Sequence, residues 1–210
     1  MSINRSKSGC AKSAGAGTLK AGVVAAVLGI ACQKLAPAAA RALAGSASAN
    51  ADRFALITFT DHNGNATTLA EFRGKAVVVI FGYADCPDLC STTLTEMGQA
   101  MRLLGTDASR VQVVFVTLDP TRDARTLLAQ IVPAFDPDFL GLFGDAAQTA
   151  QAAHEFEVFY KERPGSTPDS YSVDHTAGSF VLDPRGQLRL FLHYGMEPEK
   201  MAADIRRLLE

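Results

Sequence analysis

Hydrophobic positions after residue 50 follow two spacings, one typical of strands and one typical of helices. Residues 76–81 (AVVVIF) and 111–118 (VQVVFVTL) are nearly continuous apolar, β-branched runs, which predict two buried central strands. Apolar side chains at helical spacing predict helices over 89–104, 123–132, 146–156 and 198–209. Shorter strands are expected over 54–59, 139–143, 179–182 and 188–192, with a polar turn at 61–65.

The order of these elements predicts the fold class. The tight turn Asp183-Pro184-Arg185-Gly186 joins the last two strands, so these form an antiparallel hairpin. Strand–helix–strand–helix, followed by a hairpin and a final helix, predicts an α/β fold with a mixed central sheet flanked by helices. This is the thioredoxin-like pattern, with an extra helix and strand before the C-terminal β-hairpin and helix.

The first 50 residues differ from the rest of the chain. A basic start leads into an apolar stretch of 12 residues, Ala21 to Cys32. A spanning helix needs about 20 apolar residues, and the pattern fits an export signal better. We expect residues 1–50 to be an export signal or membrane anchor plus an Ala-rich linker, and residues 51–210 to be a domain in the periplasm. Cleavage after Ala44 or Ala49, a lipid on Cys32 and retention as an anchor stay open.

Charge excludes one class of partner. Six of the 20 basic residues and none of the 22 acidic ones lie in residues 1–50, so residues 51–210 carry a net charge of −8. Nucleic-acid binding needs a basic face. We therefore expect no nucleic-acid partner, whereas membrane association through the N-terminal segment remains open.

Two cysteines, Cys86 and Cys90, remain in the domain, because Cys10 and Cys32 lie in the targeting segment. They follow the strand at 76–81 and stand at the expected start of a helix. If both are helical, a spacing of four places their Cβ atoms about 5–6 Å apart. The helix start favours thiolates, and two thiolates suit Cu(I) or Zn(II). A structural disulfide and a redox couple are alternatives, although redox pairs usually have two intervening residues instead of three.

Residues next to Cys86 and Cys90 also affect the chemistry of this pair. Pro87 is expected at the first helical position. Asp85 and Asp88 disfavour a second anion nearby, and a bound cation would relieve that repulsion.

One of four histidines is a candidate third donor. His62 lies in a polar turn and is expected to be solvated, while His154 in a surface helix and His193 near a strand end are expected to have structural or solvent roles. His175 lies in residues 171–176, which we expect to form a loop before the hairpin. In a thioredoxin-like fold that loop faces the cysteine turn. Two sulfurs and one imidazole would then make a three-coordinate site.

Three stretches, GKAVVVIFGYADCPDLC, VTLDPTRD and VDHTAGSFVLDPRG, together resemble the Sco/SenC family of copper-binding proteins. The resemblance covers nearly all of residues 53–210. It implies a thioredoxin-like, exported or membrane-tethered protein that helps deliver copper to the dinuclear centre of cytochrome c oxidase. It also implies Cys86, Cys90 and His175 as ligands of one copper ion, Cu(I) or Cu(II). Asp119 matches a family acid that steadies the site or its proton balance, with a strand-end cap as the alternative role.

The resulting functional hypothesis is a copper metallochaperone and not an enzyme. Its partner would be the copper-bearing subunit of cytochrome c oxidase or another copper chaperone. The alternative is a thiol–disulfide reductase that uses Cys86 and Cys90 to keep a partner's cysteines reduced before metal insertion. A chaperone needs His175 and a reductase does not. A peroxidase is disfavoured, because no lone cysteine stands beside a threonine and an arginine in the expected way.

Overall fold

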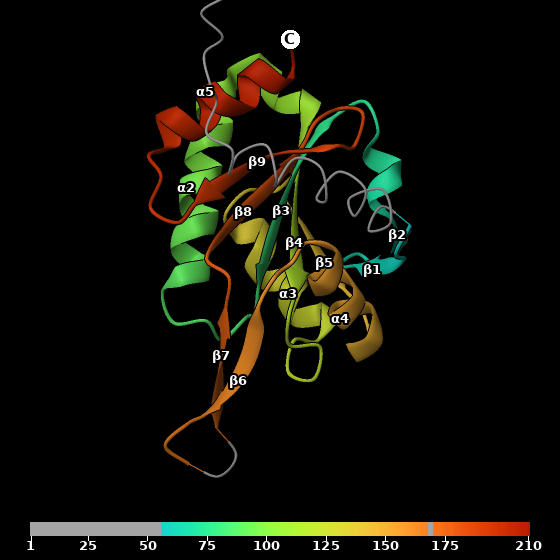
Figure 1. Ribbon diagram of the computed structural model, residues 1–210, viewed down its shortest axis with the longest axis vertical. Helices are drawn as coiled ribbons and strands as arrows, with labels where there is room; N and C mark the ends of the chain where they lie inside the picture. The colour runs from blue at the N-terminus through green and yellow to red at the C-terminus, as the bar shows by residue number, and fades with distance from the viewer. Residues whose placement is uncertain (1–55, 168–169) are drawn as a thin grey trace, which may run out of the picture. The chain divides into compact units, whose positions relative to one another are not determined.

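The computed structural model describes residues 56–167 and 170–210 (Figure 1). The predictions for residues 1–50 therefore lie outside the described residues. The strands are β1 (Phe59–Asp61), β2 (Ala66–Thr67), β3 (Ala76–Gly82), β4 (Val111–Thr117), β5 (Leu140–Phe143), β6 (Tyr160–Pro164), β7 (Tyr171–His175), β8 (Gly178–Leu182) and β9 (Leu188–His193). The helices are α2 (Leu89–Leu104), α3 (Arg125–Ile131), α4 (Ala146–Glu155) and α5 (Pro198–Leu208), with short 3-10 helices η1 (Leu69–Phe72), η2 (Gly105–Arg110) and η3 (Val132–Ala134).

The main sheet has seven strands in the order β2-β1-β5-β4-β3-β8-β9. β3, β4 and β5 run parallel, and β8 joins β3 antiparallel before turning back into β9. The sheet is therefore mixed, with helices on its faces, and it ends in a hairpin and a helix. This confirms the predicted fold class.

β3 lies inside the sheet, between β4 and β8, and is buried along its whole length. Alternate residues beginning at Ala76 pack in one apolar cluster with α2 and α5, and those beginning at Val77 pack in a second cluster with η1 and α4. Every residue from Ala76 to Phe81 is at most 3% exposed. Burying a valine, isoleucine or phenylalanine side chain contributes about 1.5–3 kcal/mol. The carboxyl end of β3, where the cysteine segment begins, is therefore firmly positioned.

The strand expected over 54–59 is placed differently. Its first two residues lie outside the described part of the chain, and of the rest only Phe59 is in a strand, because β1 continues to Asp61. The Asp61 carboxylate accepts the backbone N–H groups of Asn63 and Asn65, at 2.9 and 2.8 Å. This side-chain turn closes the β1–β2 hairpin, which confirms the turn predicted at 61–65. The strand before it begins and ends later in the sequence than predicted.

The prediction of a loop over 171–176 was wrong, because the first five of these residues form β7. β7 pairs antiparallel with β6 in a separate two-stranded sheet, with Tyr160 opposite His175. In Figure 1 this hairpin extends away from the main sheet. Only Val173 of its ten strand residues is buried. Strands this polar carry no apolar pattern, so only their pairing reveals them.

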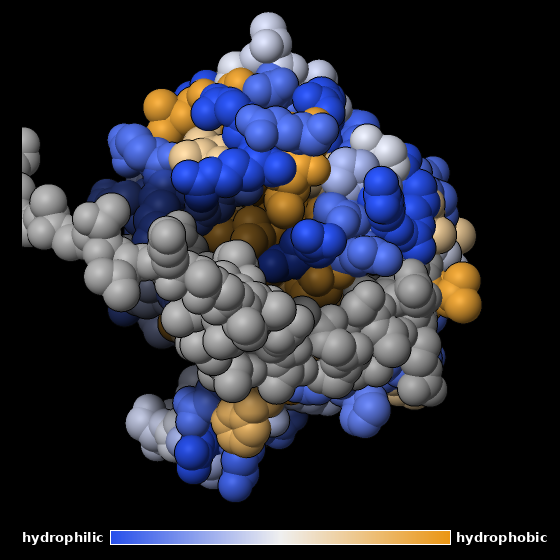
Figure 2. Space-filling view, turned by 45° about the horizontal axis from the view of Figure 1, so that its top comes forward, coloured by the Kyte–Doolittle hydropathy of each residue, from blue (hydrophilic) through white to orange (hydrophobic). Residues whose placement is uncertain are grey.

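The surface seen in Figure 2 is mostly hydrophilic over the described residues, and hydrophobic side chains show in a hollow between them and as separate spots elsewhere. No helix in residues 56–167 or 170–210 combines the length and apolar character needed to cross a bilayer.

α4 ends in a strained position. The backbone angle φ of Glu157 is +54°. Among the described residues, Glu157 is the only non-glycine residue with a positive φ. It follows the helix, and the next N–H, from Val158, donates to the carbonyl of Ala153 at 2.8 Å. This is a left-handed helix cap, which glycine usually occupies because it lacks Cβ.

We predict that Glu157→Gly stabilises the protein by about 0.5–1 kcal/mol, because the Cβ penalty of the left-handed conformation disappears and exceeds the added chain entropy. Thermal unfolding followed by circular dichroism should show a rise of about 2–3 °C. Glu157→Ala removes the carboxylate but keeps Cβ, so it should give no such gain. An equal gain in both variants would contradict the backbone explanation.

Candidate metal centre

The cysteine segment leaves the end of β3 as a turn and then enters α2. The Cys86 N–H donates to the Tyr83 carbonyl at 3.2 Å, and α2 begins at Leu89. Cys86 and Pro87 therefore precede the helix, and the expectation that Pro87 occupies the first helical position was wrong. Cys90 lies in the first turn as predicted. Both cysteines are free thiols.

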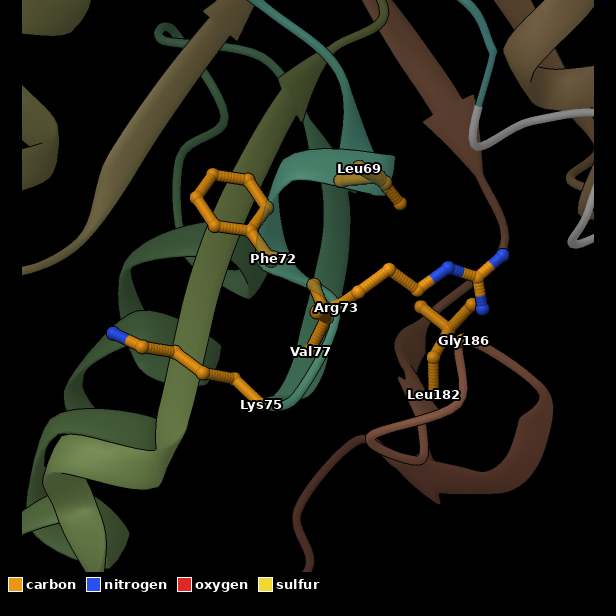
Figure 3. Close-up of a pocket in the computed structure, with 7 residues that line it drawn as sticks. All are labelled: Leu69, Phe72, Arg73, Lys75, Val77, Leu182 and Gly186. Carbon is orange, nitrogen blue, oxygen red and sulfur yellow. The ribbon is translucent and has the colours of Figure 1, made fainter.

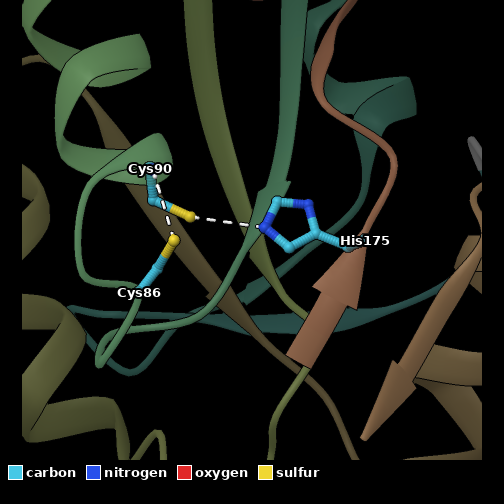
Figure 4. A group of neighbouring side chains, drawn as sticks. All are labelled: Cys86, Cys90 and His175. Carbon is cyan, nitrogen blue, oxygen red and sulfur yellow. Dashed lines mark hydrogen bonds between the residues drawn. The ribbon is translucent and has the colours of Figure 1, made fainter. Parts of the chain in front are cut away.

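The helix start faces Cys86. The backbone N–H of Cys90 points at the Cys86 sulfur, at 3.4 Å (Figure 4). Cys86 is partly exposed, whereas Cys90 is buried against the end of β3. A Cβ atom at Gly82 would lie 2.6 Å from the Cys90 sulfur and 2.8 Å from the Phe115 ring. Cys90 can occupy this position only because residue 82 has no side chain.

The two thiols have opposite electrostatic environments. The hydrogen bond from the Cys90 thiol is the main cause that lowers the pKa of Cys86 to about 4; the His175 side chain and the Cys90 backbone N–H act in the same direction, and burial opposes them. The pKa of Cys90 is raised, because its proton is held by the Cys86 sulfur and because it is buried. The pair thus holds one negative charge, on the more accessible sulfur.

His175 reaches the cysteines from the end of β7. Its Nε2 atom lies 3.6 Å from the Cys90 sulfur, as Figure 4 shows. Its Nδ1 atom lies 3.0 Å from the carbonyl oxygen of Thr176, which can only accept a hydrogen bond. Nδ1 therefore carries a proton, and Nε2 is the ring atom that faces the sulfur. Metal-binding histidines are commonly oriented by this kind of carbonyl contact.

The three donor atoms fit one small, soft metal ion. The ligand atoms of Cys86, Cys90 and His175 lie within 4.8 Å of one another, and no other such group of three occurs among the described residues. Metal–sulfur and metal–nitrogen bonds of about 2.3 and 2.0 Å at tetrahedral to trigonal angles separate the two donors by about 3.5–3.8 Å. The observed 3.6 Å between sulfur and Nε2 matches this separation.

Asp119 lies beyond these donors. Its carboxylate accepts hydrogen bonds from the Nε and backbone N–H of Arg122 and, at 2.9 Å, from the Tyr171 hydroxyl. No hydrogen bond in the described part of the chain joins it to Cys86, Cys90 or His175. Asp119 therefore closes the turn after β4 and contacts the strand that carries His175, instead of touching a donor.

Asp123 was missed by the sequence reasoning. Both oxygens of its buried carboxylate accept the Ala84 N–H, at 2.9 and 3.1 Å, and one accepts the Thr117 hydroxyl at 2.6 Å. It therefore ties the cysteine turn to the end of β4, and burial raises its pKa. The stretch VTLDPTRD contains Asp123, but the amino-acid sequence alone does not show which of its two aspartate side chains turns toward the cysteine segment.

The other histidines lie elsewhere. His62 is 8% exposed, and its Nδ1 accepts the Gly141 N–H at 2.9 Å. The expectation that His62 is solvated was therefore wrong; it joins the β1 turn to β5. His154 is exposed in the last turn of α4, and His193 is exposed at the end of β9, as expected.

A family model described as SCO1/SenC matches residues 46–210. The chain belongs to the SCO1/SenC family. The mitochondrial SCO2 homolog of Homo sapiens is 36% identical over 149 residues, which are 70% of this chain and 56% of that protein. The chain thus spans little more than half the length of this relative.

Solved structures with copper bound are among those similar to this chain. Bradyrhizobium japonicum ScoI with copper bound superposes with a TM-score of 0.68 at 36% identity, over 73% of this chain and 97% of that one. Yeast Sco1 with copper bound gives 0.66 at 28% identity, over 72% and 84%. The thioredoxin-like fold predicted for the chain is confirmed by this likeness.

The pocket drawn in Figure 3 is unrelated to the donor cluster of this SCO1/SenC chain. It is lined by Leu69, Phe72, Arg73, Lys75, Val77, Leu182 and Gly186. These residues belong to η1 and the segment after it, to the beginning of β3 and to the end of β8 with its following turn, whereas the cysteines follow the other end of β3. The Arg73 side chain lies directly against Gly186. The cysteine–histidine cluster is therefore the candidate site.

In the reduced, metal-free protein we predict that iodoacetamide modifies Cys86 much faster than Cys90 at pH 7, because Cys86 is the accessible thiolate. With a pKa near 4, its rate should stay nearly level between about pH 8 and 5, where an ordinary thiol loses about tenfold per pH unit. Peptide mapping by mass spectrometry measures both sites.

Cys90→Ala is the control for this measurement. It removes the thiol donor, so the pKa of Cys86 should rise and its alkylation rate should become steeply dependent on pH. A tenfold fall per pH unit already in the unsubstituted protein would show that Cys86 is not a stabilised thiolate.

Proposed function

We propose that the chain is a copper metallochaperone that holds one copper ion through Cys86, Cys90 and His175 and passes it to a partner. The observation that carries this proposal is the convergence of two sulfurs and one oriented imidazole nitrogen within 4.8 Å. Two thiolates with an imidazole favour copper over hard cations such as Mg²⁺ or Ca²⁺. The copper-bound relatives with 36% and 28% identity support the choice of metal.

The exposure of the donors supports transfer over permanent storage. Cys86 and His175 are partly exposed, whereas Cys90 is 5% exposed. An incoming ligand from a partner can replace the two outer donors first, while Cys90 keeps hold of the ion until the last exchange. No substrate is turned over in this process, so the first proposal does not make the chain an enzyme.

The partner and the location follow from the family and from the N-terminal segment. Membership of the SCO1/SenC family supports the copper-bearing subunit of cytochrome c oxidase, or another copper chaperone, as the partner. The basic start and the apolar stretch of residues 1–50 support export. The domain then works in the periplasm, either free or held at the membrane by that segment.

The second candidate function is thiol–disulfide reduction, which the contrast between the two thiols favours. Cys86, as the thiolate, would attack a partner disulfide and release one partner thiolate. The Cys90 thiol would then lose its proton and attack the Cys86 sulfur, which frees the partner and leaves a Cys86–Cys90 disulfide. Two electrons pass to the partner, and His175 takes no part in either bond change.

We predict that Cys86→Ala and His175→Ala each weaken Cu(I) affinity by about 100-fold or more. Loss of a ligand should weaken binding more than loss of a residue that only orients a ligand. The metal-free variants should stay folded, because the cluster lies at the edge of the core. Anaerobic competition with a chromogenic Cu(I) chelator gives the affinity. The sulfur-to-copper absorption band after Cu(II) addition should vanish in the His175 variant.

His154→Ala is the matched control, since it removes an exposed histidine of α4 that is not one of the three donors, and it should leave copper binding unchanged. Unaltered affinity in His175→Ala would exclude the three-donor site. Loss of copper binding in His175→Ala with full retention of disulfide reduction by the apo protein would show that both functions exist and separate at this residue.

A further inference from the structure

Arg122 contacts both of the segments that carry the metal donors. It lies in the turn after β4, 32 residues or more from either cysteine or His175 in sequence. On one side its Nη1 donates to the Tyr171 carbonyl at 2.8 Å, at the first residue of β7. On the other side the same Nη1 lies 3.9 Å from the Asp85 carboxylate, next to Cys86.

Stacking strengthens the contact with β7. The guanidinium of Arg122 lies 3.6 Å from the centroid of the Tyr171 ring, within cation–π range. The Tyr171 hydroxyl donates to Asp119, whose carboxylate also binds Arg122 Nε. The three side chains of Asp119, Arg122 and Tyr171 thus form a closed unit, called here the Arg122 clamp. The Asp119 side chain is 3% exposed and that of Arg122 26%. The pair is therefore shielded from water more than a surface ion pair.

The hairpin of β6 and β7, which carries His175, needs such an anchor. β6 and β7 pair only with each other among the described strands, and an isolated two-stranded hairpin is marginally stable in water. The Arg122 clamp fixes β7 at Tyr171, and His175 stands four residues further along the same strand. Tyr83, whose ring lies 5.6 Å from the Arg122 guanidinium, meets the His175 ring edge-on at 6.1 Å.

We propose that Arg122 is the positioning residue that holds His175 at bonding distance from the cysteines. It acts through Tyr171 and β7, and it touches neither a donor atom nor the metal. Without Arg122, β7 moves relative to the cysteine turn, and the third donor is lost for part of the time. The proposal rests on the proposed copper site, and its test includes a measurement on the metal-free protein that does not.

The first experiment is a double-mutant comparison of Cu(I) affinity by chelator competition. Arg122→Met should weaken binding by about tenfold or more, as loss of an orienting partner does at metal sites. In the His175→Ala background the same substitution should change affinity by less than about twofold, because its effect passes through His175. An unchanged affinity in Arg122→Met, or an equal loss in both backgrounds, would overturn the proposal.

Arg163→Met is the matched control. Arg163 lies on the same hairpin and forms an exposed ion pair with Asp174 at 2.6 Å. Exposed pairs contribute little, so this variant should bind copper like the unsubstituted protein. A loss equal to that of Arg122→Met would assign the effect to hairpin charge and not to the clamp.

The second experiment measures amide hydrogen exchange in the metal-free protein. Arg122→Met should speed exchange across β6 and β7 and leave that of β3 unchanged, since β3 lies in the core. Unchanged exchange in the hairpin would overturn the positioning role even if copper binding falls. If His175→Ala binds copper normally, the proposed copper site fails, and hydrogen exchange alone then decides whether Arg122 holds β7.

Discussion

The burial of β3 on both faces is the constraint on which the rest of the molecule depends. A strand packed between two apolar layers cannot slide or rotate, so its carboxyl end is fixed. The Leu118 N–H donates to the Gly82 carbonyl at 2.7 Å and fixes the end of β4 beside it. The cysteine turn, Asp123 and Arg122 all follow these two strand ends. Parallel strands therefore bring the chemistry of two distant segments to one edge of the sheet.

The donor cluster has one part in the core and one part outside the main sheet. Cys90 is packed in the core, whereas His175 belongs to a hairpin outside the main sheet. The two proposed functions would share this pair of cysteines, and only copper binding would need the hairpin that carries His175.

Sequence patterns predicted most of the core and little of the periphery. The runs at 76–81 and 89–104 gave correct elements, because burial imposes apolar spacing on both. β6 and β7 carry almost no apolar residues, so their pairing left no pattern to read. The cluster of Cys86, Cys90 and His175 was anticipated from motifs, whereas the contacts of Asp123 depend on side-chain direction, which spacing does not encode. The prediction that His62 is solvated was wrong because a polar turn can still pack against β5.

Glycine at position 82 has a consequence for how the chain can change over generations. The space that its missing side chain leaves is filled by the Cys90 sulfur and the Phe115 ring. A larger residue fits there only if both neighbours turn aside or become smaller. Because one of those neighbours is a proposed donor, each such change displaces or removes a sulfur of the proposed site. Variation at position 82 is thus coupled to variation of the proposed donor pair.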